Sequence, residues 1–340
     1  MPARSTSTTT GPTTATTTSP SADPRTQHPG AGTAGEGTLL GRGFRGEDSP
    51  KVRQLAQPGT AAVATAAAAG RGRKSVTRPI LRWHGGKWKL ADWIIANLPP
   101  HRVYVEPFGG AASVLLKKPR SYAEVYNDLD GEVVNLFRVV RDHGEELRRA
   151  LELTPFARDE FAESYRKAKD PLEQARRTVA RAFMGFGSNA HNKATGFRAN
   201  SNRSGTTPAR DWRNYPDALG AIIDRLQGVV IENRDAIDVV QAHDGDETVH
   251  YVDPPYVSAT RGKGGDYRHE MTDADHEQLA LALHALRGAV VLSGYRSALY
   301  DDLYSNWRRI ERHAHADGAR SRIECLWLSP SCPARGLFDA

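Results

Sequence analysis

Cysteines, long apolar runs and metal-binding patterns are all scarce in this sequence of 340 residues. The two cysteines, Cys325 and Cys332, have a spacing that suits no common zinc site and forms no disulfide framework. The twelve histidines show no metal-ligand spacing. No apolar run approaches the ~20 residues that cross a bilayer. These absences argue against a disulfide-rich secreted protein, a membrane protein and a metalloenzyme, so we expect a cytoplasmic protein without a metal.

Aromatic side chains are nearly absent from residues 1–78, where Phe44 is the only one. The segment is rich in Thr, Ala, Ser, Gly and Pro, and it cannot bury enough apolar surface to offset the entropy lost on ordering. We therefore predict a disordered, low-complexity tail over residues 1–78. A start codon assigned too early would give the same pattern, and the acid-poor beginning vaguely resembles an organelle transit peptide.

The net charge of +6 belongs to this tail, because residues 1–78 hold ten basic and four acidic side chains. The rest of the chain holds 36 of each and is neutral. Within it, however, residues 172–215 carry eight Arg or Lys against two acids. Scattered arginines often form a solvated surface, but a basic segment inside a neutral domain favours contact with a polyanion.

Beyond the tail, short apolar runs alternate with helical patterns. A strand, a turn and a helix are predicted over residues 103–117. A second strand over residues 122–126 stops at Asn127-Asp128, before a helix that Asp130 caps. This alternation is typical of a parallel, doubly wound α/β sheet. Further predicted elements are strands at 228–231, 249–252 and 289–292, a helix at 272–286 that Thr272 caps, and a terminal hairpin from 307–313 and 323–328.

One region interrupts the alternation. Residues 155–187 predict two helices, and from Gly185 to Tyr215 periodicity disappears while asparagines, arginines and aromatics occur together. We therefore expect an insert within the α/β domain. The predicted parts are the tail at 1–78, a first part of the α/β domain at 79–150, the insert at 151–219 and a second part of the α/β domain at 220–335.

The sequence Asp253-Pro254-Pro255-Tyr256 follows a predicted strand, where doubly wound sheets bind ligands. An aromatic amino nitrogen is a poor nucleophile because its lone pair is delocalised. A carboxylate from Asp253 and a carbonyl from Pro254 can accept both N–H bonds and favour a tetrahedral nitrogen. The fixed φ of proline makes such a turn rigid, and Tyr256 can stack on a base. This pattern indicates methyl transfer to an exocyclic amino group.

Three further motifs precede this one in a specific order. Trp83-His84-Gly85-Gly86-Lys87 comes first, Glu106-Pro107-Phe108-Gly109-Gly110-Ala111-Ala112 follows a strand, and Asn127-Asp128-Leu129-Asp130 follows the next strand. Each alone has a simple structural interpretation, such as a tight turn or a helix cap. All four in order make the chain resemble the D12-class, Dam-like adenine-specific DNA methyltransferases, over about residues 79–330.

The resemblance implies a doubly wound Rossmann-like methyltransferase sheet with an inserted helical and loop-rich target-recognition subdomain. It implies S-adenosylmethionine as the cofactor and site-specific transfer to the N6 of an adenine flipped out of duplex DNA. The catalytic positions implied are Asp253, Pro254, Pro255 and Tyr256. The cofactor positions implied are Trp83, Lys87, Glu106, Phe108, Gly110, Asp128 and Asp253. Two positions depart from the family pattern: His84 replaces alanine and Ala112 replaces glycine.

Duplex DNA is the expected partner, and the protein is expected to act as a monomer; a cognate restriction endonuclease is compatible with this interpretation. Arginine and asparagine can recognise base edges, and the segment from Arg261 to Arg268 is predicted to be a mobile flap. The candidate DNA contacts are Arg181, Asn189, Asn192, Lys193, Arg198, Arg203, Arg261 and Lys263.

Three alternative functions remain open at this stage. The same chemistry suits the N4 of cytosine, although the motif order favours adenine. Methyltransferases of RNA or protein amides more often have Asn at the position of Asp253, and they leave the basic insert unexplained. A DNA-binding relative that has lost catalysis is disfavoured by the intact Lys87, Asp128 and Tyr256.

Overall fold

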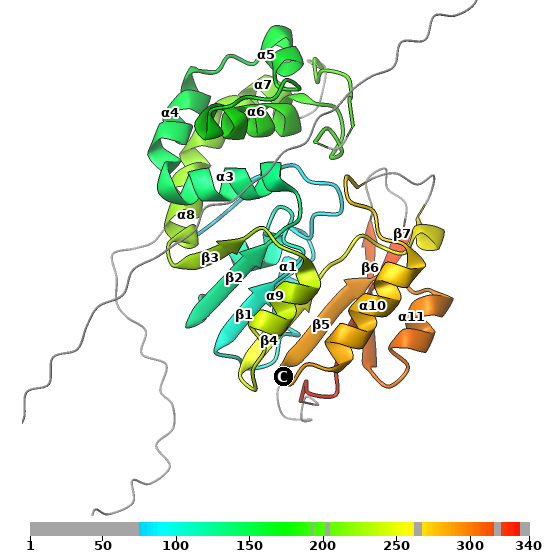
Figure 1. Cartoon of the computed structure of the whole chain (residues 1–340). Helices are drawn as coiled ribbons and strands as arrows, with labels where there is room; N and C mark the ends of the chain where they lie inside the picture. Colours follow the sequence, from blue (N-terminus) through cyan, green and yellow to red (C-terminus); the bar gives the residue numbers. More distant parts are fainter. Residues whose placement is uncertain (1–74, 192, 201–204, 262–266, 316–320, 334–340) are drawn as a thin grey trace, which may run out of the picture. The chain divides into compact units, whose positions relative to one another are not determined.

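The computed structural model describes residues 75–191, 193–200, 205–261, 267–315 and 321–333. These residues build a seven-stranded sheet with the strand order β3-β2-β1-β4-β5-β7-β6, flanked by helices (Figure 1). The strands are β1 (Val103–Glu106), β2 (Ala123–Asn127), β3 (Val229–Glu232), β4 (Thr248–Val252), β5 (Ala289–Gly294), β6 (Arg308–His315) and β7 (Ser321–Leu328).

The predicted parallel sheet is confirmed for five strands, since β3, β2, β1, β4 and β5 pair in parallel. The predicted terminal hairpin is also confirmed. Its strand β7 lies between β5 and β6 and is antiparallel to both. The sheet is therefore mixed. The five parallel strands end at one edge, where their carboxyl ends and the motifs that follow them meet.

Alternate side chains of the strands face two different apolar layers. Tyr104 and Tyr126 pack with α1 (Ala91–Ile95), α2 (Ser113–Lys117) and α3 (Gly131–Asp142) on one face. Val105 and Val125 contact Val239 of α9 (Ala236–Ala242) on the other face. Strands β4 and β5 are buried along their whole length for this reason. The second face is also covered by α10 (Asp273–His284) and α11 (Ala298–Leu303).

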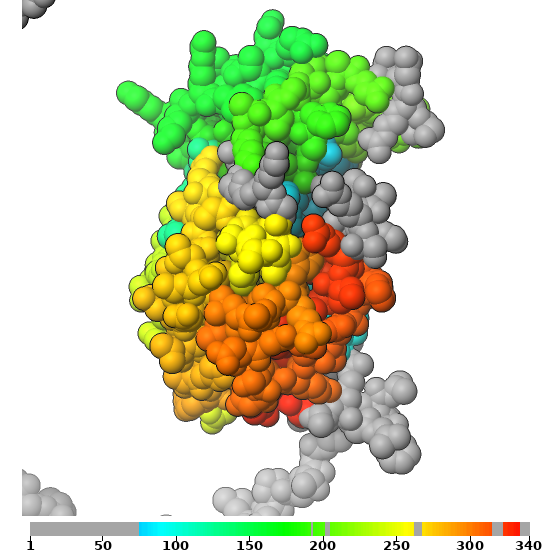
Figure 2. Space-filling model, turned by 90° about the vertical axis from the view of Figure 1, so that its right-hand side faces the viewer, coloured from blue at the N-terminus to red at the C-terminus, as the bar shows by residue number. Residues whose placement is uncertain are grey.

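A group of helices, the helical unit, lies beside the β3 side of the sheet (Figure 1) and forms the green surface in Figure 2. Its side chains Phe137, Leu147, Val179 and Ile222 share one core. The predicted insert 151–219 begins and ends inside helices of this unit, so its helices span more of the chain than expected. The unit contains α3, α4 (Gly144–Leu153), α5 (Arg158–Glu163), α6 (Pro171–Met184), α7 (Pro208–Arg213) and α8 (Tyr215–Leu226).

Most of the predicted tail, residues 1–74, lies outside the described residues. The described structure already includes Val76, which packs against the core. The guanidinium of Arg78 lies 3.2 Å from Asp211 and over the ring of Tyr215. Folded structure therefore starts before residue 79. No described helix is long and apolar enough to cross a membrane, and both cysteines are free and buried.

Local sequence explains several helix ends. Asp130 caps α3 by accepting a hydrogen bond from the backbone of Glu132, as predicted. Thr272 and Asp275 form a complete capping box at the start of α10. The helix α7 was not predicted, because it has only six residues within an aperiodic segment, although Thr207 caps it.

We predict that His250 makes stability depend on pH. This fully buried residue lies in β4. Burial lowers its pKa to about 4, against the opposing effect of Asp244. The unfolded chain binds a proton at the ordinary pKa of about 6.5, so the contribution is intact above pH 6.5 and is lost as the pH falls towards 4. Lowering the pH from 7.5 to 5 should therefore reduce the free energy of unfolding by about 2 kcal/mol through His250.

The measurement is urea denaturation of the wild type and of His250→Leu at both pH values. Between these two pH values, the free energy of unfolding of the variant should fall by about 2 kcal/mol less than that of the wild type. An equal loss in both proteins would show that His250 does not carry the effect.

Candidate active site

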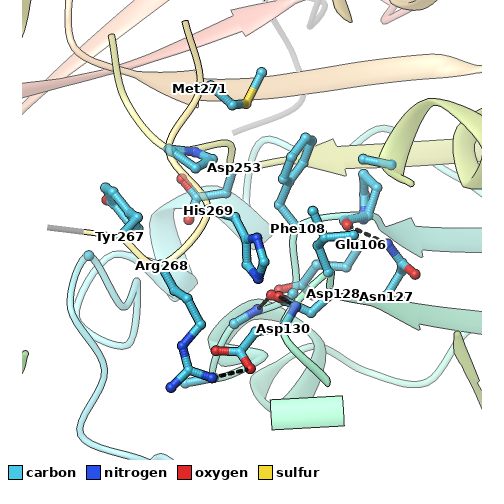
Figure 3. A pocket seen from close by; sticks show the side chains of 18 of the residues that line it. Glu106, Phe108, Asn127, Asp128, Asp130, Asp253, Tyr267, Arg268, His269 and Met271 are labelled. Atoms are coloured by element: carbon cyan, nitrogen blue, oxygen red, sulfur yellow. Dashed lines mark hydrogen bonds and ion pairs between the residues drawn. The ribbon is translucent and has the colours of Figure 1, made fainter. Parts of the chain in front are cut away.

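The motifs found in the sequence meet around one cavity of about 310 Å³ at the carboxyl ends of β1, β2 and β4 (Figure 3). Residues from all four motifs line it, together with residues 234–237 after β3 and residues 267–271 before α10. The lining includes Trp83, Lys87, Glu106, Phe108, Gly110, Asp128, Asp253 and Pro255. Every predicted cofactor position therefore lies at this cavity.

The glycine-rich turn after β1 is shaped by close contacts. Gly110 has a φ of +46°, and a Cβ there would lie 2.6 Å from Nε1 of Trp83. Its backbone N–H donates to Oδ2 of Asp128 over 2.7 Å. Ala112, where the family pattern has glycine, has a φ of +51°. This left-handed conformation costs a non-glycine residue about 1–2 kcal/mol, which explains why glycine is usual at that position.

Two acidic side chains at the strand ends have raised pKa values because they are desolvated. Asp128 accepts backbone hydrogen bonds from Gly110 and Asp130, but burial raises its pKa to about 6. Glu106 accepts from the hydroxyl of Tyr104 and from the backbone of Leu115. Burial raises the pKa of Glu106 to about 8. Burial thus favours the protonated form of Glu106 more than that of Asp128.

Asp253 is held by two groups through the same oxygen. Its Oδ1 accepts from the hydroxyl of Ser293 at 2.7 Å and lies 2.9 Å from Nζ of Lys87. Lys87 also donates to the carbonyl of Gly85 at 2.8 Å. Burial lowers the pKa of Lys87, but the nearby charges of Asp253 and Glu324 raise it above its ordinary value. The ammonium therefore stays charged beside the Asp253 carboxylate.

Tyr256 does not line the cavity in this structure. Its hydroxyl donates to Oε2 of Glu324 over 2.8 Å. The Lys87 ammonium lies 4.7 Å from the centre of its ring, and the ring of Tyr295 meets it edge-on at 4.6 Å. Pro254 is buried between Asp253 and the partly exposed Pro255. One face of the ring predicted to stack on a base is thus contacted here by Lys87.

A buried polar network links the helical unit to the cavity. His191, in the loop after α6, contacts Oδ2 of Asp130 through Nε2 at 2.8 Å. Its Nδ1 lies 3.1 Å from the guanidinium of Arg181, which can only donate. Nδ1 must therefore accept, which places the proton on Nε2 and makes His191 neutral. Its ring also lies 4.8 Å from that of Trp83. No sequence pattern indicated this role, because His191 belongs to an aperiodic segment.

Residues 267–271 line the cavity beside the sequence motifs (Figure 3). Arg268 forms an ion pair with Asp130 at 3.0 Å. That ion pair and the contact with His191 lower the pKa of Asp130 to about 2, although burial alone would raise it. Tyr267 approaches so closely that a Cβ on Gly85 would lie 2.8 Å from its hydroxyl. The end of the predicted flap therefore contacts two cofactor motifs, whereas residues 262–266 lie outside the described part.

The residues predicted to contact DNA differ in their burial and in their partners within the protein. Arg181 is only 5% exposed and is paired with Glu132, a placement that does not fit contact with DNA. Arg198 donates to the carbonyl of Phe183, and Arg261 pairs with Glu270. Lys193 is exposed and Asn189 is half-buried, whereas Asn192, Arg203 and Lys263 lie outside the described residues. The prediction did not include Phe186, which is 73% exposed in the same basic segment.

No group of three or more His, Cys, Asp or Glu side chains is arranged to hold a metal within the described ranges. The sheet order, with its antiparallel strand β7, and the cavity at the strand ends define the class of Rossmann-like methyltransferases. A model of the D12 class N6 adenine-specific DNA methyltransferases matches residues 83–317. The chain belongs to this family and is an adenine-specific DNA methyltransferase.

Curated relatives agree with this family. A DNA adenine methylase from Serratia marcescens is 26% identical over 245 residues, covering 67% of this chain and 87% of that protein. A DNA adenine methylase from Escherichia coli strain K12 is 27% identical over 188 residues, covering 54% and 67%. A type II methyltransferase from Lactococcus lactis subsp. cremoris is 26% identical over 270 residues, covering 72% and 90%.

We predict that Gly110→Ala weakens binding of S-adenosylmethionine about tenfold or more. The added Cβ would collide with Trp83 and would disturb the hydrogen bond to Asp128, and each tenfold loss of affinity corresponds to about 1.4 kcal/mol. Isothermal titration calorimetry provides the dissociation constant. Gly220→Ala is the control, because nothing lies within 4 Å of its added Cβ. Unchanged affinity in Gly110→Ala would argue against this cavity as the cofactor site.

Proposed function

We propose that the chain binds S-adenosylmethionine in the cavity and transfers its methyl group to the N6 of an adenine flipped out of duplex DNA. One observation carries the proposal. The Asp253 carboxylate lines the same cavity as the glycine-rich turn and Asp128, so the acceptor of the amino hydrogens and the candidate cofactor groups are adjacent. Bound S-adenosylmethionine would supply an electrophilic methyl group on sulfonium.

The cavity residues fit such a cofactor. Ligand pockets are commonly apolar with a few convergent polar groups, and this one combines Phe108, Ile237 and Leu279 with carboxyl groups. We assign the ribose hydroxyls to Asp128, whose carboxylate lies at the end of β2. The turn at Gly110 leaves a space beside Trp83 that a side chain would fill. Protonated Glu106 adds a second polar group, able to donate or accept.

For catalysis we assign the amino group of the adenine to Asp253. Oδ1 is already engaged by Ser293 and Lys87, so Oδ2 is the oxygen available for an amino N–H. The carbonyl of Pro254 would accept the second N–H and complete a tetrahedral nitrogen. After transfer, the nitrogen carries one proton too many, and Asp253 is the nearest base for it. Such positioning and electrostatic preorganisation supply most of the rate.

Stacking of the base on the face of Tyr256 that Lys87 contacts requires Lys87 to move off that ring. The base then replaces the contact of Lys87 with the ring, while the Asp253 carboxylate offers Oδ2 to the amino group. We propose that Lys87 changes position when the adenine enters.

We propose that the basic segment contacts DNA through its exposed side chains. Lys193 suits a phosphate contact, and Phe186 suits insertion at a base step, because it is exposed and follows Gly185 at the end of α6. Arg181 is excluded from this set by its burial. Phosphate contacts add affinity without sequence information, so the target sequence depends on other side chains of the insert.

We predict that Asp253→Ala reduces methyl transfer by about 10³-fold, the scale seen when a preorganised polar group is removed from a transition state. The measurement is the amount of N6-methyladenine in DNA after incubation with S-adenosylmethionine, determined by nucleoside mass spectrometry. Asp246→Asn is the control, since its carboxylate is 81% exposed and lies outside the cavity. Full activity of Asp253→Ala would rule out the assigned mechanism.

We predict that Lys193→Ala weakens DNA binding and lowers the slope of log affinity against log salt by about one. The loss of a single phosphate contact releases one counterion fewer. Fluorescence anisotropy with labelled duplex DNA at several salt concentrations gives both quantities. Lys169→Ala serves as the control, because Lys169 is also exposed but precedes the basic segment. An identical slope for both variants would remove Lys193 from the interface.

A further inference from the structure

Glu324 is a buried carboxyl group that the sequence motifs do not include. It lies in β7 and is 8% exposed. Burying a carboxyl group is costly unless other polar groups contact it. Here the contacting group belongs to the Asp-Pro-Pro-Tyr motif: the hydroxyl of Tyr256 donates to Oε2 of Glu324 over 2.8 Å. Tyr295 and Lys87 also act on Glu324, and both lower its pKa. Its partners thus include two of the predicted site residues.

The sheet topology explains how a residue so late in the chain reaches this site. The strand β5 ends at Gly294, which pairs with Cys325 of the antiparallel strand β7. Glu324 is one residue earlier in β7 and pairs only with Arg312 of β6. Because β7 runs antiparallel, its beginning extends past the end of β5 at the edge where the parallel strands end. In Figure 2 the orange-red surface of this hairpin lies near the yellow surface that follows the catalytic motif.

The site therefore contains one cation that interacts with two acidic groups. Lys87 pairs with Asp253, and the charge of Glu324 further raises its pKa. Burial and Asp253 raise the pKa of Glu324, whereas Lys87 and the hydrogen bond from Tyr256 lower it, and the net shift is upward. Tyr256 lies between the two acids: its ring is under Lys87 and its hydroxyl is on Glu324.

We propose that Glu324 is a positioning residue for methyl transfer, which fixes the Tyr256 ring through its hydroxyl and helps to hold Lys87 when the target base displaces it from that ring. This inference rests on the proposed function. The hydrogen bond from the Tyr256 hydroxyl to Glu324 holds the ring in one orientation towards the base. The second carboxyl keeps a counter-ion near the ammonium as Lys87 moves off the ring, so entry of the base does not leave a buried charge without a partner.

Loss of Glu324 should affect the rate of methyl transfer and the affinity for the cofactor differently. Glu324 does not line the cavity, so its loss should leave the affinity for S-adenosylmethionine within about twofold of the wild type. Misplacement of a reacting group by about 1 Å can cost on the order of 100-fold in rate. Glu324→Ala should therefore slow single-turnover methyl transfer about 10- to 100-fold. Glu324→Gln keeps an oxygen that accepts from Tyr256, and should recover part of this loss.

A double-mutant cycle tests whether Glu324 acts through Tyr256. Tyr256→Phe removes the hydroxyl and keeps the ring. If the two groups act as one unit, the double variant with Glu324→Ala and Tyr256→Phe should be little slower than the slower single variant. Glu311→Ala is the matched control, because Glu311 lies on the same hairpin and pairs in register with Cys325. Its carboxylate accepts a hydrogen bond from Arg309. Its transfer rate should equal that of the wild type.

Single-turnover rates, cofactor affinity by calorimetry and melting temperature are measured for all variants. A wild-type rate in Glu324→Ala would overturn the inference, and so would additive losses in the double variant. Parallel losses of cofactor affinity and melting temperature, without rescue by Glu324→Gln, would assign Glu324 a structural role and also overturn it. Failure of the proposed function is distinct, because the wild type itself would then transfer no methyl group.

Discussion

The ion pair between Lys87 and Asp253 joins the first and last motifs of the site across more than half of the folded chain. The buried ammonium of Lys87 is costly alone, so it requires the Asp253 carboxylate or a substitute. This constraint fixes the Asp253 oxygen that remains for substrate, places Lys87 against the ring of Tyr256, and makes Glu324 useful as a second acid.

A second buried network ties the helical unit to the candidate cofactor site. The carboxylate of Asp130 caps α3, contacts His191 of the helical unit and pairs with Arg268 beside the cavity. Because Asp128 is two residues away and accepts the backbone N–H of Asp130, the same short segment serves the cofactor site and the insert. The insert is thus attached to the catalytic sheet by paired polar groups as well as by the apolar core of the helices.

Local patterns were enough to predict much of this arrangement. Strand ends at Glu106, Asn127 and Val252 follow from apolar runs that stop at polar motifs, and parallel pairing brings those ends together. What remained unpredicted depends on long-range pairing. Glu324 reaches Tyr256 only because β7 inserts antiparallel beside β5, and His191 gains its role only from the folded loop. The burial of Arg181 also escaped prediction, since a basic segment does not reveal which of its arginines are paired internally.

We expect this site to methylate the amino group of adenine. Nucleoside analysis of unmethylated DNA tests this, after incubation with the purified wild-type chain and S-adenosylmethionine carrying a labelled methyl group. Label is expected in N6-methyladenine at a defined sequence. Label in N4-methylcytosine alone, or no label in DNA, would contradict this expectation.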